Sequence, residues 1–305
     1  MANQITHAVT AGANYNVLSD LIRVVYAKEI EFAALPALRF EQFADIKTEL
    51  GVNPGLTVTM VTYDNLTAGA VLTEGTDMDT KYMSSSTVSI TVAEYGNAVA
   101  VSELLLRTSF DDVLSSAAKL LGNDYGKVKD GIMRTAALTT TNVKYAYSGG
   151  VAAANRLAIT ATHYFSTDPV KDAVEVLATN DAPYVDGSGY VCLIHPRQAR
   201  YMRDDNAWIN ASNYGAPEQL FTGEIGKYEN VRFIETTQMP TVVSTVTVYQ
   251  AIMVGLDAYG LAIGLPVEMR DDGVKNFGRV HAVAWYNIMG AALLHNGRAV
   301  RIESC

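Results

Sequence analysis

The pair Gly226-Lys227 is the first feature of the sequence that could support chemistry, because a glycine and a lysine also end a phosphate-binding loop. Tyr228 follows the pair where that loop requires a Ser or Thr to bind magnesium. Phe221 stands five residues before Gly226, where the loop requires another glycine. The pair therefore does not predict a nucleotide site.

Two further spacings match parts of ligand or catalytic motifs. Asp77 and Asp79 have the first spacing of a calcium loop, but Tyr82 stands at its sixth position, where the turn requires glycine. Gly187-Ser188-Gly189 lacks the residue that separates the serine from each glycine in the nucleophile elbow of hydrolases, and it indicates a turn. The histidines show no HExxH spacing. The sequence thus predicts no metal site and no hydrolase site.

Three other polar or reactive features have a structural explanation. His195 precedes a proline and is expected to cap a helix, and Cys192 lies in an apolar run, where a thiol is usually an inert core residue. Arg197, Arg200 and Arg203 recur every three residues, which is typical of a solvated or ion-paired helix face. We therefore expect no enzyme and no cofactor.

Composition places the chain among globular proteins and argues against several functional classes. Of its 305 residues, 49% are hydrophobic and 18% are charged, which suits a packed core and not a disordered chain. The formal net charge is −9, so no excess of cations is present to neutralise the phosphates of a dedicated nucleic-acid binder. Two cysteines, Cys192 and Cys305, cannot build a disulfide framework.

Neither a signal peptide nor a membrane span is expected. The stretch 1–20 contains no Lys or Arg and no sustained apolar run. The longest uncharged apolar stretch, 282–294, is interrupted by Asn287 and is shorter than the ~20 residues that a membrane span needs. We therefore expect no membrane partner.

The first part of the chain combines a helix with a long hairpin. Apolar residues near helical spacing predict a helix over 17–38, which Pro36 ends. Alternating polar and apolar residues predict two strands, 57–61 and 87–92, that pair as a hairpin. The residues between them, 64–86, include few large apolar side chains. This tip has no core of its own, and we infer that it lies on another copy of the chain.

A long helix and an α/β region follow. Ser109 and Asp112 form a variant of the capping box, and apolar residues at steps of one, three or four predict a helix over 110–138. The later elements are expected, in order, to be a helix with Asp168 as its N-cap, a buried strand 190–194, a helix 197–203, strands 231–234 and 241–251, a glycine-punctuated return 258–264, an apolar segment 280–294 and a final strand 298–302.

This order of elements resembles the major capsid proteins of tailed bacteriophages, which have the Hong Kong 97-type fold. Within that group, the run Leu72–Asp77 and the stretch from Val88 through Asn97 to Leu104 are similar to the coat-protein family of N-four-like phages. His195–Gln198 after a short strand, and Gly223–Gly226 before a strand, match the A-domain of that family. The resemblance covers nearly the whole chain.

The resemblance implies an α+β protein with the domains of that capsid fold. They are expected to be an N-terminal arm (1–51), an E-loop (52–100), a P-domain with the spine helix (101–165), an α/β A-domain (166–265) and return strands of the P-domain (266–305). The implied function is a major capsid protein that assembles through pentamers and hexamers into an icosahedral shell around double-stranded DNA. The implied location is the virion capsid, assembled in the host cytoplasm.

The resemblance also implies partners and a contact surface. The chain begins directly with the arm, so a separate scaffolding protein is expected beside the portal, and the packaged DNA is expected to be contacted weakly and non-specifically. The residues expected to contact a neighbouring subunit from the E-loop tip are Glu74, Asp77, Asp79, Lys81 and Tyr82.

Two alternatives stay open at the level of the sequence. An encapsulin-like compartment uses the same fold to hold a cargo enzyme, and its distinguishing feature is an inner pocket for a cargo peptide. An α/β hydrolase built on 166–265 would need a nucleophile motif, and the sequence contains none.

Overall fold

The structure is a computed structural model of the chain. The residues that it describes are 38–48, 57–63, 66, 69, 71–72, 74–75, 77–78, 80–109, 113–185, 187, 189–208 and 226–305. The helix predicted over 17–38 therefore lies outside the described residues, apart from Leu38.

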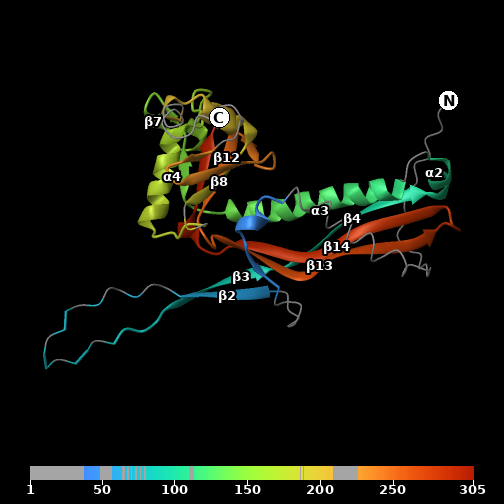
Figure 1. The fold of residues 1–305 in the computed structure, drawn as a ribbon, viewed down its shortest axis with the longest axis horizontal. Coiled ribbons are helices and arrows are strands. Elements are labelled where there is room, and N and C mark those ends of the chain that lie inside the picture. The colour runs from blue at the N-terminus through green and yellow to red at the C-terminus, as the bar shows by residue number, and fades with distance from the viewer. Residues whose placement is uncertain are drawn as a thin grey trace. The chain divides into compact units, whose positions relative to one another are not determined.

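The described elements are mostly strands (Figure 1). In chain order they are η2 (Glu41–Phe43), β1 (Asp45–Lys47), β2 (Thr57–Tyr63), β3 (Ser85–Thr91), β4 (Ala93–Ser102), α2 (Glu103–Thr108), α3 (Val113–Ala137), β5 (Val143–Tyr145), β6 (Tyr147–Ser148), β7 (Val151–Ala152), η4 (Arg156–Ala158), α4 (Thr167–Thr179), β8 (Tyr190–Ile194), α5 (Pro196–Arg203), β9 (Lys227–Tyr228), β10 (Val231–Glu235), β11 (Thr241–Val243), β12 (Thr247–Val254), β13 (Tyr259–Lys275), β14 (Val280–Leu293), η5 (Asn296–Arg298) and β15 (Ala299–Ser304).

The chain forms two compact units, and it passes between them within β4, α3, β13 and β14. The described residues within 95–126 and 267–287 belong to unit 1, and those within 38–94, 127–266 and 288–305 belong to unit 2. In unit 1, Tyr125 of α3 packs edge-on against Trp285 of β14, with ring centroids 5.4 Å apart. The Trp285 Nε1–H also donates a 3.0 Å hydrogen bond to Asp124, so the indole is both buried and satisfied.

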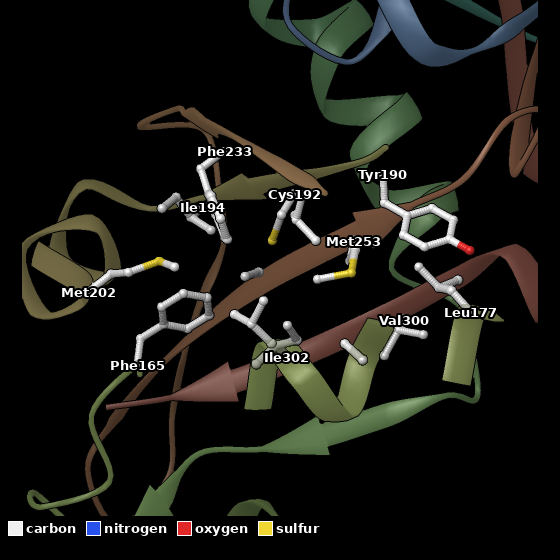
Figure 2. Close-up of a cluster of buried hydrophobic side chains, with 14 of the residues drawn as sticks. Phe165, Leu177, Tyr190, Cys192, Ile194, Met202, Phe233, Met253, Val300 and Ile302 are labelled. Carbon is white, nitrogen blue, oxygen red and sulfur yellow. The ribbon is translucent and has the colours of Figure 1, made fainter. Parts of the chain in front are cut away.

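Unit 2 contains a seven-stranded sheet with its own hydrophobic core. The strand order is β5-β15-β12-β8-β10-β9, and β11 pairs with β12. β8 is buried along its whole length, which explains its continuous apolar sequence. Figure 2 shows that side chains of β8, β12 and β15 meet Leu177 of α4, Met202 of α5 and Phe165 in one apolar cluster. All residues of this cluster belong to unit 2.

A second sheet has the order β1-β13-β14-β4. β1 is a terminal strand and pairs with β13 in parallel register, with Asp45 opposite Gly260. β2 and β3 form a separate antiparallel hairpin, in which Thr57 is opposite Thr91 and Tyr63 is opposite Ser85. The hairpin predicted from alternation is therefore confirmed.

The described residues confirm most elements predicted from local patterns and correct three of them. The N-cap of α4 is Ser166, and Asp168 lies in the first turn, where a carboxylate favours the positive end of the helix dipole. The strand predicted over 241–251 is two antiparallel strands, β11 and β12, joined by a tight turn in which the Ser244 N–H bonds to the Val246 carbonyl. The short return predicted over 258–264 is the first part of β13, whose pairing continues it to Lys275.

Candidate assembly surface

One face of the β2–β3 hairpin packs at its base on the parts of β13 and β14 that belong to unit 2. Val58, Met60 and Val88 pack beside Ile90 in a cluster with side chains of β13 and β14, and Ile90 is fully buried. Because side chains alternate across a strand, the intervening threonines and serines lie on the opposite face. The hairpin thus has one attached face at its base.

A glycine determines how closely the hairpin base approaches β14. A Cβ atom built at Gly290 would lie 2.2 Å from the Thr91 carbonyl oxygen and 3.1 Å from the Val92 Cα. Both contacts involve backbone, which cannot rotate away as a side chain can. Gly290 is therefore required for this packing, and an isolated glycine inside an apolar strand is the sequence signal of such a close approach.

Beyond the paired strands, the hairpin tip exposes large apolar side chains. Val71 is 97% exposed and Tyr82 is 93% exposed, and Leu72, Met78 and Met83 are also exposed. Isolated exposed apolar residues are ordinary, but a run of them on a segment without a core marks an interaction surface. The tip is suited to contact with another protein surface.

Four of the five residues predicted at the E-loop tip lie within the described residues. Glu74, Asp77, Lys81 and Tyr82 are all exposed, and Gly75 between the two acids has a φ of 84°, in the region that favours glycine. Asp79 lies outside the described residues. The sequence prediction missed the apolar residues on the same segment, although their types are visible in the sequence.

A pocket of about 360 Å³ lies between β1 and β2 in unit 2. Its lining combines apolar side chains of β2 with ionisable side chains of β1 and of residues 257 and 295. The lining residues are Asp45, Lys47, Val58, Thr59, Met60, Val61, Asp257, Leu294 and His295. The pocket was not predicted, because it joins segments that are far apart in sequence.

Lys227, His195 and Cys192, which were also considered from the sequence, each have a structural role or a buried position in the fold. Lys227 lies on the short strand β9, which pairs with β10, so it does not stand on a loop before a helix as a phosphate-binding lysine does. The His195 Nδ1 accepts a 3.1 Å hydrogen bond from the Arg197 N–H, which confirms the capping role, and burial lowers the pKa of His195. Cys192 is fully buried, and burial raises the pKa of its thiol.

The basic stripe on α5 is partly paired, as the sequence indicated. Arg203 lies 3.7 Å from Glu235, and the Arg197 guanidinium lies over the Tyr201 ring, 5.2 Å from its centroid. Among the described residues, no group of three or more His, Cys, Asp or Glu side chains could hold a metal ion. Likewise, no helix within the described ranges is long and apolar enough to cross a membrane.

Three solved structures illustrate what the fold is similar to. The capsid of Ralstonia phage GP4 is 17% identical, with a TM-score of 0.67 over 88% of this chain and 90% of that chain. The capsid of cyanophage P-SCSP1u is 13% identical, with a TM-score of 0.70 over 99% and 93% of the two chains. The capsid asymmetric unit of cyanophage Pam1 is 15% identical, with a TM-score of 0.69 over 100% and 99%. At these identities the similarity shows the fold.

A comparison with curated proteins finds no match. The family model described as "Phage capsid protein" matches residues 85–301, which include β3, the long helix α3 and nearly all of the later strands. Because this match covers more than half of the 305 residues, the chain belongs to the phage capsid protein family.

Proposed function

We propose that the chain is the major capsid protein of a tailed bacteriophage and that it is similar to the coat proteins of N-four-like phages. It self-assembles through pentamers and hexamers into an icosahedral shell that encloses double-stranded DNA. The observation that carries this proposal is a fold similar to phage capsids over nearly the whole chain, joined to an exposed apolar hairpin tip. Membership of the phage capsid protein family makes it a structural protein of the virion capsid and not an enzyme.

The elements of the structure support a division into the parts of the Hong Kong 97-type fold. We assign residues 1–51 to the N-terminal arm and 52–100, with the β2–β3 hairpin, to the E-loop. Residues 101–165 carry the spine helix α3 of the P-domain, and 166–265 carry α4, α5 and most of the seven-stranded sheet as the A-domain. Residues 266–305 return to the P-domain, although their last strand, β15, pairs with β12 in the seven-stranded sheet.

The E-loop tip is the proposed contact with a neighbouring subunit. Exposed Val71 and Tyr82 would bury apolar surface there, which is the main favourable term in protein association. Glu74, Asp77 and Asp79 would direct the encounter and fix its register, together with Lys81, since charges at an interface contribute more to these than to affinity.

Further partners follow from the proposed role. The shell assembles in the host cytoplasm with a separate scaffolding protein and a portal. The net charge of −9 supports weak, non-specific contact with packaged DNA, because a predominantly negative wall does not hold phosphates.

The decisive experiment replaces residues 66–84 with Asn-Gly, so that a short loop of four residues joins Tyr63 to Ser85, the last pair of the hairpin. The variant should stay soluble with nearly unchanged helix content, because the core of unit 2 does not involve the tip. It should fail to form closed particles in electron microscopy under the conditions in which the parent assembles with any scaffold. Closed shells at the parental yield would refute the E-loop assignment, and an unfolded aggregate would show that the hairpin tip belongs to the monomer core.

A matched pair of variants tests the charges alone. Reversing Glu74, Asp77 and Asp79 to Lys should slow or misdirect assembly at low salt, whereas Gln or Asn at the same positions should have a smaller effect, because neutral groups do not repel the partner. Circular dichroism of both variants should match the parent. Equal assembly rates for the parent and the reversed variant would contradict a role of these acids.

A further inference from the structure

Residues 38–47, called the clasp here, attach the start of the described chain to other elements of unit 2. The clasp contains η2 and β1, and its side chains Leu38, Phe40 and Phe43 are buried. Residues 1–37 precede it in the sequence, so the clasp fixes the point at which that segment joins unit 2.

Asp130 of α3 holds the clasp by its backbone. The Asp130 Oδ1 accepts hydrogen bonds from the N–H groups of both Arg39 and Phe40, each 2.9 Å long, and the side chain of Asp130 is fully buried. Two successive N–H groups can converge on one anion only when the chain takes a particular local path. The carboxylate therefore constrains the direction of the chain as well as its attachment.

Neighbouring groups complete the attachment from three elements. The Tyr259 hydroxyl of β13 donates a 2.6 Å hydrogen bond to the Phe40 carbonyl, and the ring of Phe40 is fully buried. Lys129, next to Asp130 on α3, forms an ion pair with Glu41. The Arg232 guanidinium of β10 lies 5.7 Å from the centroid of a clasp aromatic ring, that of Phe43. Phe40 thus has its N–H, its carbonyl and its ring held at once.

A buried carboxylate such as that of Asp130 has an unfavourable desolvation free energy. Burial raises the pKa of Asp130, although the two backbone N–H groups and the charges of Arg134 and Arg39 oppose that shift. The Asp130 Oδ2 is buried and has no hydrogen-bond partner among the described residues. An apolar side chain would avoid this cost, so the position of Asp130 in the core points to a specific use of Oδ1.

We propose that Asp130 is a positioning residue for assembly, which fixes the direction of the backbone at Arg39 and Phe40, where the preceding segment joins the clasp. The proposal rests on the proposed capsid function, since the direction matters when that segment must reach another subunit. Side-chain packing of Leu38 and Phe43 alone would hold the clasp in place but would let its backbone adjust. The paired N–H bonds remove that freedom.

The test uses the free subunit first, with D130A, D130N and the control N123A on the exposed face of the same helix. In D130A the amides of Arg39 and Phe40 lose their acceptor, so their hydrogen exchange should accelerate about tenfold or more, and trypsin should cleave faster after Arg39. D130N retains an acceptor oxygen and should restore protection. Protection of β8 and β12 should be unchanged in all three variants.

Assembly of the same variants gives the second measurement. D130A should yield few closed particles, while D130N and N123A should assemble like the parent. Unchanged exchange in D130A would overturn the proposal, and so would normal shells from D130A despite an open clasp. If the parent itself forms no shells under any condition, the proposed capsid function fails, whereas the exchange measurement still decides whether Asp130 holds the clasp.

Discussion

Substitution of Gly290 by alanine should detach the hairpin base from β14. The added Cβ would meet the Thr91 carbonyl oxygen at 2.2 Å, whereas ordinary contact begins at 3.4 Å. One of the two backbones must therefore move by about 1.2 Å, and both belong to paired strands. The change cannot be absorbed by a rotamer.

The magnitude follows from the packing that this movement disturbs. Overpacking of a core costs ~1–3 kcal/mol, and the upper end applies here because the clash is with backbone. The displacement also loosens Ile90, which is fully buried at the hairpin base. We expect G290A to lower the free energy of unfolding by about 3 kcal/mol.

Gly264 on the adjacent strand β13 provides the matched control. Its added Cβ would lie 3.2 Å from the Ile288 Cγ2, so that side chain must yield by only about 0.2 Å to reach ordinary contact at 3.4 Å. Replacing glycine by alanine without strain stabilises by ~0.4–1 kcal/mol through the unfolded chain, so G264A should be neutral or slightly stabilised. Urea unfolding of the free subunits and hydrogen exchange of β3 measure both effects. Parental stability and β3 protection in G290A would refute the close-approach argument.

Three further outcomes are expected. Because burial raises the pKa of Asp130, this carboxyl group binds a proton more readily in the folded protein than in the unfolded chain. The free energy of unfolding of the parent, relative to that of D130N, should therefore fall as pH rises above ~4. A difference that stays constant with pH in urea titrations would contradict this. In a C305S variant, Cys192 should react with a thiol reagent only on unfolding, because it is fully buried and its thiol pKa is raised; rapid labelling of the native state would be inconsistent with that burial. E303Q should lower the free energy of unfolding by about 3 kcal/mol, because the fully buried carboxylate of Glu303 forms ion pairs with Arg156 and Arg301. We expect the lower end of the range for breaking a buried pair, since the side chain of Arg156 is one-third exposed. A loss under ~1 kcal/mol in calorimetry would show that the pairs contribute little.

Local patterns were sufficient to predict most strands and helices of the described chain. The alternation in β2 and β3, the apolar run of β8 and the histidine cap of α5 depend on neighbouring residues, and each is confirmed. The errors occur where pairing with a distant segment decides the boundary. β13 continues past Gly264 because β14 offers a partner along its length, which periodicity within 258–264 cannot indicate.

The contacts that matter for the candidate surface join residues far apart in sequence. Asp130 meets Phe40 across 90 positions, and Gly290 meets Thr91 across the whole middle of the chain. Both have a signal that sequence reasoning could have used. Gly290 interrupts an apolar strand, and Asp130 interrupts the face of α3 that carries Met133 and Ala137. Such a residue indicates that another segment of the chain packs against that position, but it does not identify the segment.

The hairpin therefore combines two regions with separable roles. Its base is fixed by Gly290 and by the buried Ile90, so substitutions there act on the free energy of the free subunit. Its tip exposes Val71 and Tyr82 and belongs to none of the described buried clusters. Substitutions in the tip should therefore leave the subunit folded and change only its binding to other subunits. A subunit that must be soluble alone and still bind copies of itself needs this separation, because its contact surface cannot also be its core. Under the proposed function, a tip variant and a base variant should therefore fail to assemble for different measurable reasons, the first with parental unfolding behaviour and the second without it.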